Sequence, residues 1–530
     1  MIPIQINGEV YYVSSTGSDE ATGGQQEPFA SFGHAVNMLN QGDTLYVRGG
    51  TYTEYLTLDL DATESAPVLI SAFPGEHPVI DGSGFPSGDD WSGLISVSMS
   101  SHIRITGFSL QNSPGMGILA EQSSHVTIDN NRTFNTVSSG IGVWHCSDVI
   151  VDMNEVELAC NDGSQECITV ASCSLFIVSN NHVFNGGPGS NGGEGIDAKH
   201  SRIGQITGNV VHDNNRLGIY VDAWDEHTHS IDVNANISYR NDGAGIALSS
   251  ENGGLLRNIR LTNNLCYENS VWGLVVSSWD DALTHLHPMQ YIEILNNTFV
   301  YNAVDAGWGG GVTIENDQVD TLKFINNIVA WNGSFQVEGE YIQGKHAQIS
   351  LSMMNNLVYG DLTYFAEIGD LNGIIADPKF ADASMNDYRL SEDSPAIDAG
   401  ATVDLYPTDL NGNNRITGNG IDIGAYEYDS TRVDEPGEEY PLFDEVQLYP
   451  AYPNPFGETL TIVIYSPENT PARLDIFDVN GRLVANLFAT DLTIGEHQFS
   501  WNPEGLASGT YFIRMTTPQH IRKRKVTLMH

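Results

Sequence analysis

The sequence predicts an all-β protein with a parallel β-helix (solenoid) followed by a small C-terminal β-sandwich. Helix-period stretches are rare, and short runs rich in Val, Ile, Leu and Thr are separated by Gly and Asn. Nine asparagines close such runs at a spacing of roughly 23–33 residues, a period typical of one supersecondary unit stacked per repeat.

The periodic asparagines end short β-like runs such as Ile-Leu-Asn-Asn-Thr-Phe (294–299). They are Asn131, Asn154, Asn181, Asn209, Asn236, Asn264, Asn297, Asn327 and Asn356. A turn asparagine tolerates a left-handed backbone and can hydrogen-bond its own copy one coil above. We therefore expect these asparagines to form one column along the solenoid.

The chain divides into five parts in order. Residues 1–85 form an N-terminal cap and the first coils, with a helix-like stretch around Ser31–Leu39 that covers the exposed end of the solenoid. Residues 86–374 form the β-helix with its active face, and residues 375–428 a closing segment. Residues 429–444 are an acidic linker that contains Pro and Gly, and residues 445–530 form the β-sandwich.

The bulk composition excludes several classes of partner. The 530 residues carry a net charge of −45 with a pI near 4.3, which argues against nucleic acid and against anionic membranes. No apolar run approaches transmembrane length, and the N-terminus lacks the features of a signal peptide. A monomer is expected.

Five cysteines allow two disulfides in a secreted protein. Cys146 and Cys173 fall at equivalent places on neighbouring coils, ~5 Å apart, which is within disulfide range. Cys160 and Cys167 flank a polar loop, and Cys266 is expected to be a buried thiol.

Motifs near both ends of the predicted β-helix resemble those of known secreted proteins. Tyr-Tyr-Val-Ser-Ser-Thr-Gly-Ser-Asp (11–19) and Gly-Asp-Thr-Leu-Tyr-Val-Arg-Gly-Gly-Thr-Tyr (42–52) resemble the start of right-handed parallel β-helix proteins of the pectate-lyase-like superfamily. Asp-Ser-Pro-Ala-Ile-Asp-Ala-Gly (393–400) and Asp-Ile-Gly-Ala-Tyr-Glu-Tyr (422–428) resemble the closing segment of bacterial β-helices. The resemblance implies a right-handed helix and a carbohydrate-active enzyme.

The C-terminal motifs resemble the sorting domain of the type IX secretion system of Bacteroidetes across the whole of the predicted sandwich. They are Tyr-Pro-Asn-Pro-Phe (452–456), Leu-Asp-Ile-Phe-Asp-Val-Asn-Gly-Arg-Leu-Val (474–484), Leu-Ala-Ser-Gly-Thr-Tyr-Phe-Ile-Arg (506–514) and Arg-Lys-Arg-Lys-Val (522–526). The resemblance implies the type IX secretion machinery as a partner and a secreted or outer-membrane surface-attached protein, whose signal peptide is absent from this chain. The alternative, a carbohydrate-binding sandwich, is disfavoured because Trp501 is the segment's single Trp and offers little stacking surface.

A second ladder fixes which side chains point outward. Each coil has a Gly, or Cys167, before an aliphatic residue, and if that residue points inward, the residues two and four after the Gly point outward. The outward pairs are Gly142 and Trp144, Thr169 and Ala171, Asp197 and Lys199, Tyr220 and Asp222, Ala247 and Ser249, Val275 and Ser277, and Thr313 and Glu315.

Ionisable and aromatic residues gather on adjacent coils of this face. The catalytic candidates are Lys199, Asp197, Tyr220, Asp222 and Glu251, and the substrate-binding candidates are Trp224, His200, His227, His229, Trp279 and Trp144. Aromatic rings stack on pyranose faces and carboxylates bind hydroxyls, so the set is typical of a sugar-binding groove. A solvated charged ladder with a weak cross-coil pair is the structural alternative.

One hypothesis is a polysaccharide lyase acting on a uronate-containing glycan by β-elimination. Gly193-Glu194-Gly195-Ile196-Asp197 is similar to the Asp-Asp-Gly-x-Asp calcium motif of one β-helix pectate lyase family, which implies Ca²⁺ on Glu194 and Asp197. The base of that family falls at Tyr220 here, and Lys199 lies one coil earlier. Lys199 and Tyr220 are therefore both base candidates. A Lys between carboxylates should stay protonated, which makes it a poor base unless Ca²⁺ or substrate lowers its pKa.

Two other hypotheses remain open. A glycoside hydrolase would use a carboxylate pair on adjacent coils, Asp197 with Asp222 or Asp222 with Glu251, and the acidic surface suits a neutral glycan. A non-catalytic surface protein that binds glycans is compatible with the same fold.

Overall fold

The structure is a computed structural model. It describes residues 8–86, 91–187, 192–279, 286–339, 350–360 and 370–429, and, near the C-terminus, 446–448, 456, 459–466, 469–479, 481–493, 495–503, 505–518 and 521–528. Apart from Asp429, the predicted linker lies outside the described residues, as does most of the Tyr-Pro-Asn-Pro-Phe motif. No helix among the described residues is long and apolar enough to cross a membrane.

The chain forms two compact units. The first comprises Met1–Lys379 with Glu392–Tyr428, and the second comprises Phe380–Ser391 with Asp429–His530. The hairpin of β38 (Phe380–Asp382) and β39 (Asp387–Leu390), with the short 3₁₀ helix η2 (Ala383–Met385) between its strands, therefore groups with the second unit. The sequence placed this hairpin within the closing segment 375–428.

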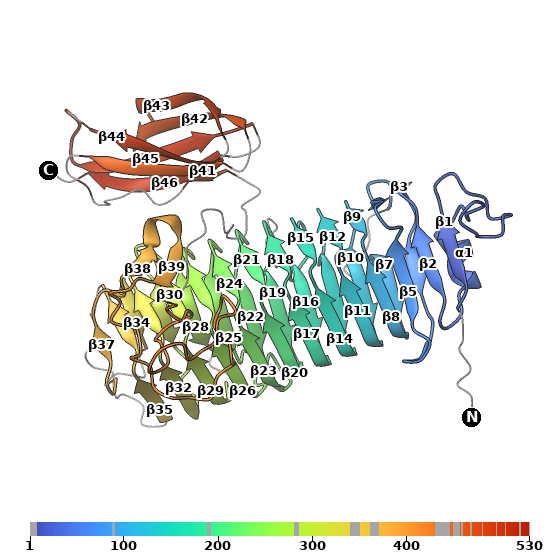
Figure 1. Cartoon of the computed structure of the whole chain (residues 1–530), viewed down its shortest axis with the longest axis horizontal. Coiled ribbons are helices and arrows are strands. Elements are labelled where there is room, and N and C mark those ends of the chain that lie inside the picture. Colours follow the sequence, from blue (N-terminus) through green and yellow to red (C-terminus); the bar gives the residue numbers. More distant parts are fainter. Residues whose placement is uncertain are drawn as a thin grey trace. The chain divides into compact units, whose positions relative to one another are not determined.

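Three parallel sheets run along the first unit, and along most of its length each coil contributes one strand to each sheet (Figure 1). Sheet 1 consists of β1 (Val10–Val13), β2 (Thr44–Val47), β5 (Val68–Ala72), β8 (Ser101–Thr106), β11 (Ser124–Asp129), β14 (Ser147–Asp152), β17 (Ser174–Ser179), β20 (Arg202–Thr207), β23 (Thr228–Asn234), β26 (Leu256–Thr262), β29 (Met289–Leu295), β32 (Thr321–Ile325) and β35 (Ser350–Met354). Sheet 2 consists of β4 (Leu56–Leu58), β7 (Gly93–Ser98), β10 (Met116–Glu121), β13 (Ile141–Trp144), β16 (Ile168–Ala171), β19 (Ile196–Lys199), β22 (Ile219–Asp222), β25 (Ala244–Ser249), β28 (Trp272–Ser277), β31 (Gly310–Ile314) and β34 (Phe335–Glu338). Sheet 3 consists of β3 (Gly50–Tyr52), β6 (Pro78–Asp81), β9 (Ser109–Gln111), β12 (Arg132–Phe134), β15 (Glu155–Glu157), β18 (His182–Phe184), β21 (Val210–His212), β24 (Ile237–Tyr239), β27 (Leu265–Tyr267), β30 (Thr298–Val300), β33 (Ile328–Ala330), β36 (Leu357–Tyr359) and β37 (Ile374–Ile375). The predicted parallel β-helix is confirmed.

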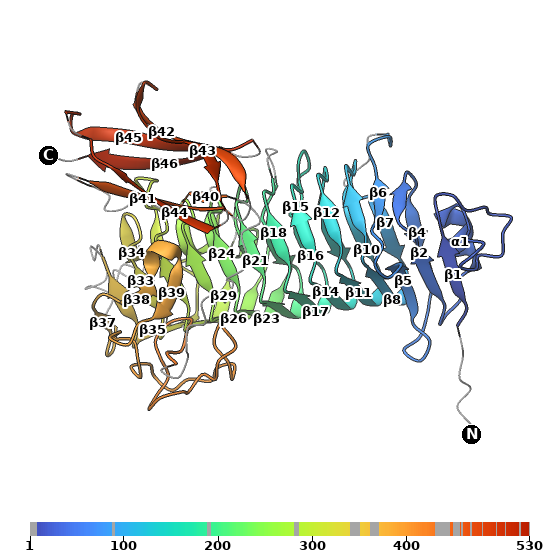
Figure 2. The same ribbon diagram turned by 45° about the horizontal axis from the view of Figure 1, so that its top comes forward.

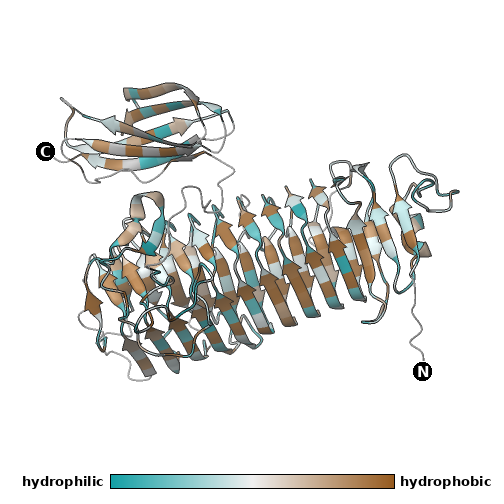
Figure 3. Cartoon of the chain, in the orientation of Figure 1, coloured by the Kyte–Doolittle hydropathy of each residue, from teal (hydrophilic) through white to brown (hydrophobic). Residues whose placement is uncertain are grey.

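The core is built from stacked aliphatic columns. Ile141, Ile168, Ile196, Ile219 and Ile246 pair in register along sheet 2, and all five are fully buried in one hydrophobic cluster. Hydrophobic positions recur on successive strands as brown bands (Figure 3). Because alternate residues of a strand face opposite sides, this inward column fixes the outward positions as predicted.

The predicted asparagine ladder is confirmed. In each step the backbone N–H and the side-chain Nδ2 of one asparagine donate to Oδ1 of the next, as from Asn209 to Asn236 at 3.0 and 2.9 Å. The ladder asparagines themselves do not have left-handed backbone. The residue immediately before each of them does, for example Asn263 with φ of 57°.

The N-terminal cap is a short helix at one end of the solenoid, α1 (Phe32–Met38), which contacts β1 and β4 (Figure 1). The Ser31 side chain caps the helix by accepting from the backbone N–H of His34, and Phe32 and Ala35 are buried. The predicted helical stretch is therefore confirmed.

Residues 392–428 lie beside the last coils, as the orange trace in both views shows (Figure 1, Figure 2). Four left-handed asparagines on consecutive coils donate their Nδ2 groups to backbone oxygens of this segment. The pairs are Asn263 with Thr408, Asn296 with Asp422, Asn326 with Ala401 and Asn355 with Ala399, at 2.7–3.1 Å. The segment thus lies along the side of the solenoid and binds four coils.

All five cysteines are buried free thiols in this structure. The two pairs suggested by the sequence nevertheless lie in contact. The backbone N–H of Cys146 lies 3.4 Å from Cys173 Sγ. Burial, followed by a hydrogen bond with the Cys167 thiol, raises the pKa of Cys160.

Besides the β38–β39 hairpin, the described residues of the second unit form two antiparallel sheets that share one core. One sheet has the order β40 (Gln447–Leu448), β41 (Leu460–Ser466) and β44 (Gly495–Trp501), and the other has β43 (Leu483–Leu492), β42 (Thr470–Asp478), β45 (Gly509–Thr516) and β46 (Ile521–Leu528). Leu460, Ile476 and Ile513 from both sheets are fully buried in a common cluster. This arrangement confirms the small β-sandwich.

Candidate functional site

The predicted outward columns of sheet 2 are confirmed by strand register. One column runs Thr169, Asp197, Tyr220, Ala247 and Val275, and the neighbouring column runs Ala171, Lys199, Asp222, Ser249 and Ser277. These side chains point outward but are not exposed, since Asp197 is 1% and Asp222 4% exposed. Adjacent coils lie ~4.8 Å apart, so ionisable groups on this face interact strongly in a poorly solvated environment.

Lys199 lies between two buried carboxylates. Its Nζ is 2.5 Å from Oε1 of Glu166 and 3.4 Å from Oδ2 of Asp197. Burial disfavours the charged ammonium, but the charges of Glu166 and Asp197 outweigh burial and raise the pKa of Lys199. Lys199 is therefore held as a cation, as the sequence predicted for a Lys between carboxylates.

Glu194 forms the second ion pair of the site. Its Oε1 lies 3.0 Å from NH1 of Arg216, whose side chain is 51% exposed while Glu194 is buried. Burial and the neighbouring Glu166 raise the pKa of Glu194 to about 7, although Arg216 favours its ionised form. Glu194 therefore changes protonation near neutral pH.

Tyr220 donates a hydrogen bond from its hydroxyl to Oε1 of Glu251, one coil later. Burial, followed by the charges of Asp222 and Glu251, raises the pKa of Tyr220. The Tyr220 ring also lies 5.3 Å, centroid to centroid, from the ring of Trp279, which follows β28. The hydrogen bond between Tyr220 and Glu251 has the geometry for proton transfer between a phenol and a carboxylate.

Asp197 and Asp222 are held towards their neutral forms. Burial raises the pKa of both carboxyl groups, with a further contribution from Glu166 at Asp197 and from Glu251 at Asp222. Oδ1 of Asp197 and Oδ1 of Asp222 have no hydrogen-bond partner among the described residues, whereas Oδ2 of Asp197 faces the Lys199 ammonium at 3.4 Å. Buried carboxyl oxygens without partners are unusual and mark a place for a proton, a water or a ligand.

The aromatic and histidine candidates divide into two groups. Trp144 lies two coils before Lys199 in the same column, and the Lys199 ammonium is 5.8 Å from its ring. Trp279 contacts Tyr220, so both tryptophans border the carboxylate cluster.

The other four candidates lie at or beyond the corner where sheet 2 gives way to sheet 1. His200 Nε2 is 2.9 Å from Oδ1 of Asp225. Trp224 and His227 are exposed. His229 is in β23 of sheet 1, paired in register with Arg202 and Arg257, so it is placed away from the cluster.

The predicted calcium ligands do not form an open calcium site. Calcium takes six to eight oxygen ligands. Here Asp197 faces the ammonium of Lys199 and Glu194 faces the guanidinium of Arg216, so each already has a side-chain cation. Among the described residues, no group of three or more His, Cys, Asp or Glu side chains is placed to hold a metal ion. The residues as arranged therefore do not fit calcium.

Sequence reasoning missed Glu166 and Arg216, the partners of Lys199 and Glu194. Both precede the Gly or Cys of their coil, a position at which only Glu194 was considered. Glu166 stands one repeat length before Glu194, at the equivalent place on the preceding coil, which is a signal that could have identified it.

A second asparagine ladder was also missed. It runs Asn214, Asn241, Asn269, Asn302 and Asn332 and ends at Gln336, with hydrogen bonds of the same type as the first ladder. Its steps of 27, 28, 33 and 30 residues repeat those of the first ladder over the same coils. It fixes the turns that lead from sheet 3 into sheet 2, beside the cluster.

Comparison with known proteins agrees with the fold. Residues 11–161 match the family described as "Pel9A-like, right handed beta helix region", and residues 92–265 match "Right handed beta helix region". Crystalline pectate lyase Pel9A has a similar fold, with a TM-score of 0.52 and 18% identity, over 80% of this chain and 97% of that one. The right-handed parallel β-helix fold is thereby confirmed, and its N-terminal part is similar to Pel9A-like β-helices.

Two curated proteins are similar in sequence. The uncharacterized protein YwoF of Bacillus subtilis is 27% identical over 456 residues, which cover 74% of this chain and 92% of YwoF. Pectate lyase PEL9 of Emericella nidulans is 32% identical over 140 residues, which cover 24% of this chain and 34% of PEL9. The Pel9A-like match ends at residue 161, before the first residue of the carboxylate cluster.

Residues 450–528 match the secretion system C-terminal sorting domain. This match confirms the prediction for the C-terminal unit, and the chain carries a sorting domain for type IX secretion. The protein is therefore secreted by that route.

Proposed function

We propose that this protein is a carbohydrate-active enzyme that cleaves the glycosidic bonds of an extracellular, uronate-containing polysaccharide by β-elimination. The observation that carries the proposal is the hydrogen bond from Tyr220 to Glu251, set among buried carboxyl groups and two cations on one face of sheet 2. The similarity to pectate lyases supports the reaction class.

β-Elimination requires a positive charge near the uronate carboxylate, a base for the C5 proton and an acid for the leaving oxygen. In the proposed reaction, Lys199 and Arg216 supply positive charge. The oxygen of Tyr220 takes the C5 proton while its own proton passes to Glu251. Electrons of the C5–H bond form the C4–C5 double bond, the bond from C4 to the glycosidic oxygen breaks, and neutral Asp222 protonates that oxygen.

Lys199 replaces calcium as the cation of the carboxylate cluster in this proposal. The ammonium already contacts Glu166 and Asp197 and stays charged. No step of the proposed reaction therefore passes through a metal ion.

Inverting hydrolysis is the second candidate, favoured by the raised pKa of Asp222. Asp197 and Asp222 lie on adjacent coils in diagonal register, since Asp197 pairs with Tyr220 and Lys199 with Asp222. Diagonal side-chain neighbours on adjacent strands lie ~7–8 Å apart, within the ~6.5–9.5 Å that leaves room for a water. Asp222 would act as the acid and the other carboxyl group as the base.

A substrate panel tests these proposals. Polyuronates, xylans and β-glucans are incubated with the protein, with and without a chelator, and products are read for near-ultraviolet absorbance and for reducing ends. Unsaturated products that persist in the chelator support the proposed reaction. Reducing ends without absorbance refute elimination in favour of hydrolysis, and activity lost in the chelator and restored by calcium refutes the role given to Lys199.

A further inference from the structure

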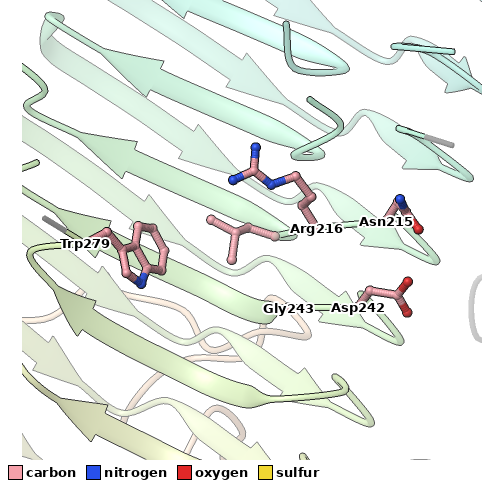
Figure 4. Close-up of a pocket in the computed structure, with 6 residues that line it drawn as sticks. Asn215, Arg216, Asp242, Gly243 and Trp279 are labelled. Atoms are coloured by element: carbon pink, nitrogen blue, oxygen red, sulfur yellow. The ribbon is translucent and has the colours of Figure 1, made fainter. Parts of the chain in front are cut away.

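A pocket of about 340 Å³ opens beside the carboxylate cluster (Figure 4). It is lined by Asn215, Arg216, Leu217, Asp242, Gly243 and Trp279. The volume is near the lower end of the ~300–1,000 Å³ found for small-molecule sites, which suits one or two sugar residues. We propose that this pocket is a binding subsite for an acidic sugar residue of the polysaccharide, with Arg216 binding the carboxylate and Trp279 stacking on the ring.

Arg216 has donors available for a ligand. Its described partner is Glu194, at 3.0 Å from NH1, and half of its side chain is exposed. A guanidinium carries five N–H donors in a planar fork that matches a carboxylate. One edge of Arg216 can therefore hold Glu194 while another binds a carboxylate from solvent.

Trp279 supplies the apolar wall. Its ring is partly exposed, faces the pocket and contacts the ring of Tyr220 on the cluster side. Figure 4 shows Trp279 on one side of the pocket, with Arg216, Asp242 and Gly243 on the other. An aromatic face opposite polar groups is the arrangement that binds a pyranose ring and its hydroxyls.

The pocket wall is preorganised by the second asparagine ladder. Asn214 and Asn241, which precede the lining residues on two consecutive coils, are joined by a hydrogen bond of 2.9 Å from Nδ2 to Oδ1. The Arg216 carbonyl also accepts from the backbone N–H of Gly243 at 2.7 Å. Because the backbone is already fixed, ligand binding does not have to order it.

Tyr220 connects this subsite to the proposed reaction. Its ring contacts Trp279 and its hydroxyl bonds Glu251, so a sugar in the pocket lies next to the residue that would take the proton. The inference rests on the proposed function for the identity of the polymer, but its own content is a binding preference for an acidic sugar.

Binding is tested by calorimetry with two probes, trigalacturonate and its fully methyl-esterified form, in an E251Q background that suppresses turnover. The acidic probe is expected to bind about 10- to 100-fold more tightly, since a charge-assisted hydrogen bond contributes ~1.5–3 kcal/mol. R216M should remove this preference, and W279A should weaken both probes to a similar extent. R257M, which removes one positive charge from sheet 1, should leave the preference unchanged.

An unchanged preference in R216M would overturn the inference, as would equal binding of the two probes by the protein with Arg216 intact. Circular dichroism verifies that R216M folds. If R216M does not fold, W279A provides an independent test, because unchanged affinity of W279A for both probes would overturn the stacking role of Trp279. Cleavage without an Arg216-dependent preference would refute the subsite and the part given to Arg216, and would leave β-elimination with Lys199 as the cation intact. Preferential binding without cleavage by the unmodified enzyme would refute the function and leave the subsite intact.

Discussion

Replacing Lys199 with Met tests whether a side-chain cation holds the carboxylate cluster together. The substitution keeps an unbranched chain but removes the charge that faces Glu166 and Asp197. Both carboxylates are then buried without a counter-ion. Met also removes any possibility that residue 199 acts as a base.

The expected loss follows from burial of the pair. Side-chain exposure is 18% for Lys199, 9% for Glu166 and 1% for Asp197. Removing one partner of a buried ion pair costs about 3–5 kcal/mol, and the residual exposure of Lys199 places the expectation at the lower end, about 3 kcal/mol. Since the entropy of unfolding grows with chain length, this corresponds to a fall in Tm of roughly 3–6 °C.

Differential scanning calorimetry at pH 8 and pH 5 is the assay, with K323M as the matched control. Lys323 also pairs with a Glu on an adjacent coil, Glu293 at 2.7 Å, but its side chain is 47% exposed. An exposed pair contributes about 0–1 kcal/mol, so K323M should change Tm little.

The pH dependence has a defined sign. The pKa of Lys199 is raised in the folded protein, so its stabilising charge persists across this pH range and is lost only above the ordinary lysine pKa. In K199M the carboxyl groups take up protons as pH falls, so the deficit in Tm should be smaller at pH 5 than at pH 8. Equal Tm shifts in K199M and K323M at pH 8 would refute the reasoning.

Three further predictions concern the site and the solenoid. E251Q should lower kcat by about 10²- to 10⁴-fold with little change in KM, because a Gln amide can accept a hydrogen bond from Tyr220 but cannot take up its proton. E315Q, just after β31, should not lower kcat, and steady-state kinetics that show equal effects of the two variants would contradict this. The pKa of Glu194 is raised to about 7, so folding favours its protonated form, and the stability of the protein should decline as pH rises from about 4.5 to about 7. E194Q should flatten that part of a curve of Tm against pH. An unaltered curve in E194Q would show that Glu194 does not titrate in this range. N236A should lower the free energy of unfolding by about 2–4 kcal/mol in a denaturant titration, because the backbone N–H and Nδ2 of Asn209 both lose their buried acceptor. The exposed Asn161 should tolerate replacement by Ala. Similar losses in the two variants would argue against the asparagine ladder as a stabilising column.

The register of the coils was predictable because side chains alternate strictly between the two faces of a strand, and each coil of the solenoid repeats this pattern. Once Ile196 and Ile219 were placed inward, Asp197, Lys199, Tyr220 and Asp222 followed as outward positions. The asparagine ladder was predictable for the same reason.

What covers the outward face was not predictable from that repeat. Glu166 and Arg216 come from turns between strands, where no period fixes side-chain direction, and they pair with Lys199 and Glu194. The lateral course of residues 392–428 depends on contacts distant in sequence, such as Asn263 with Thr408. Local pattern carries no information about such contacts.

The lateral segment changes the statistical mechanics of the solenoid. In a simple repeat protein each unit couples only to its two neighbours, so the array frays from its free end one unit at a time. Residues 392–428 add couplings between non-adjacent units, because one continuous strap binds the coils of Asn263, Asn296, Asn326 and Asn355. Opening the last coil then requires the lateral segment to detach from coils that are still folded. Unfolding at this end should therefore be a single cooperative transition and not a gradual fraying.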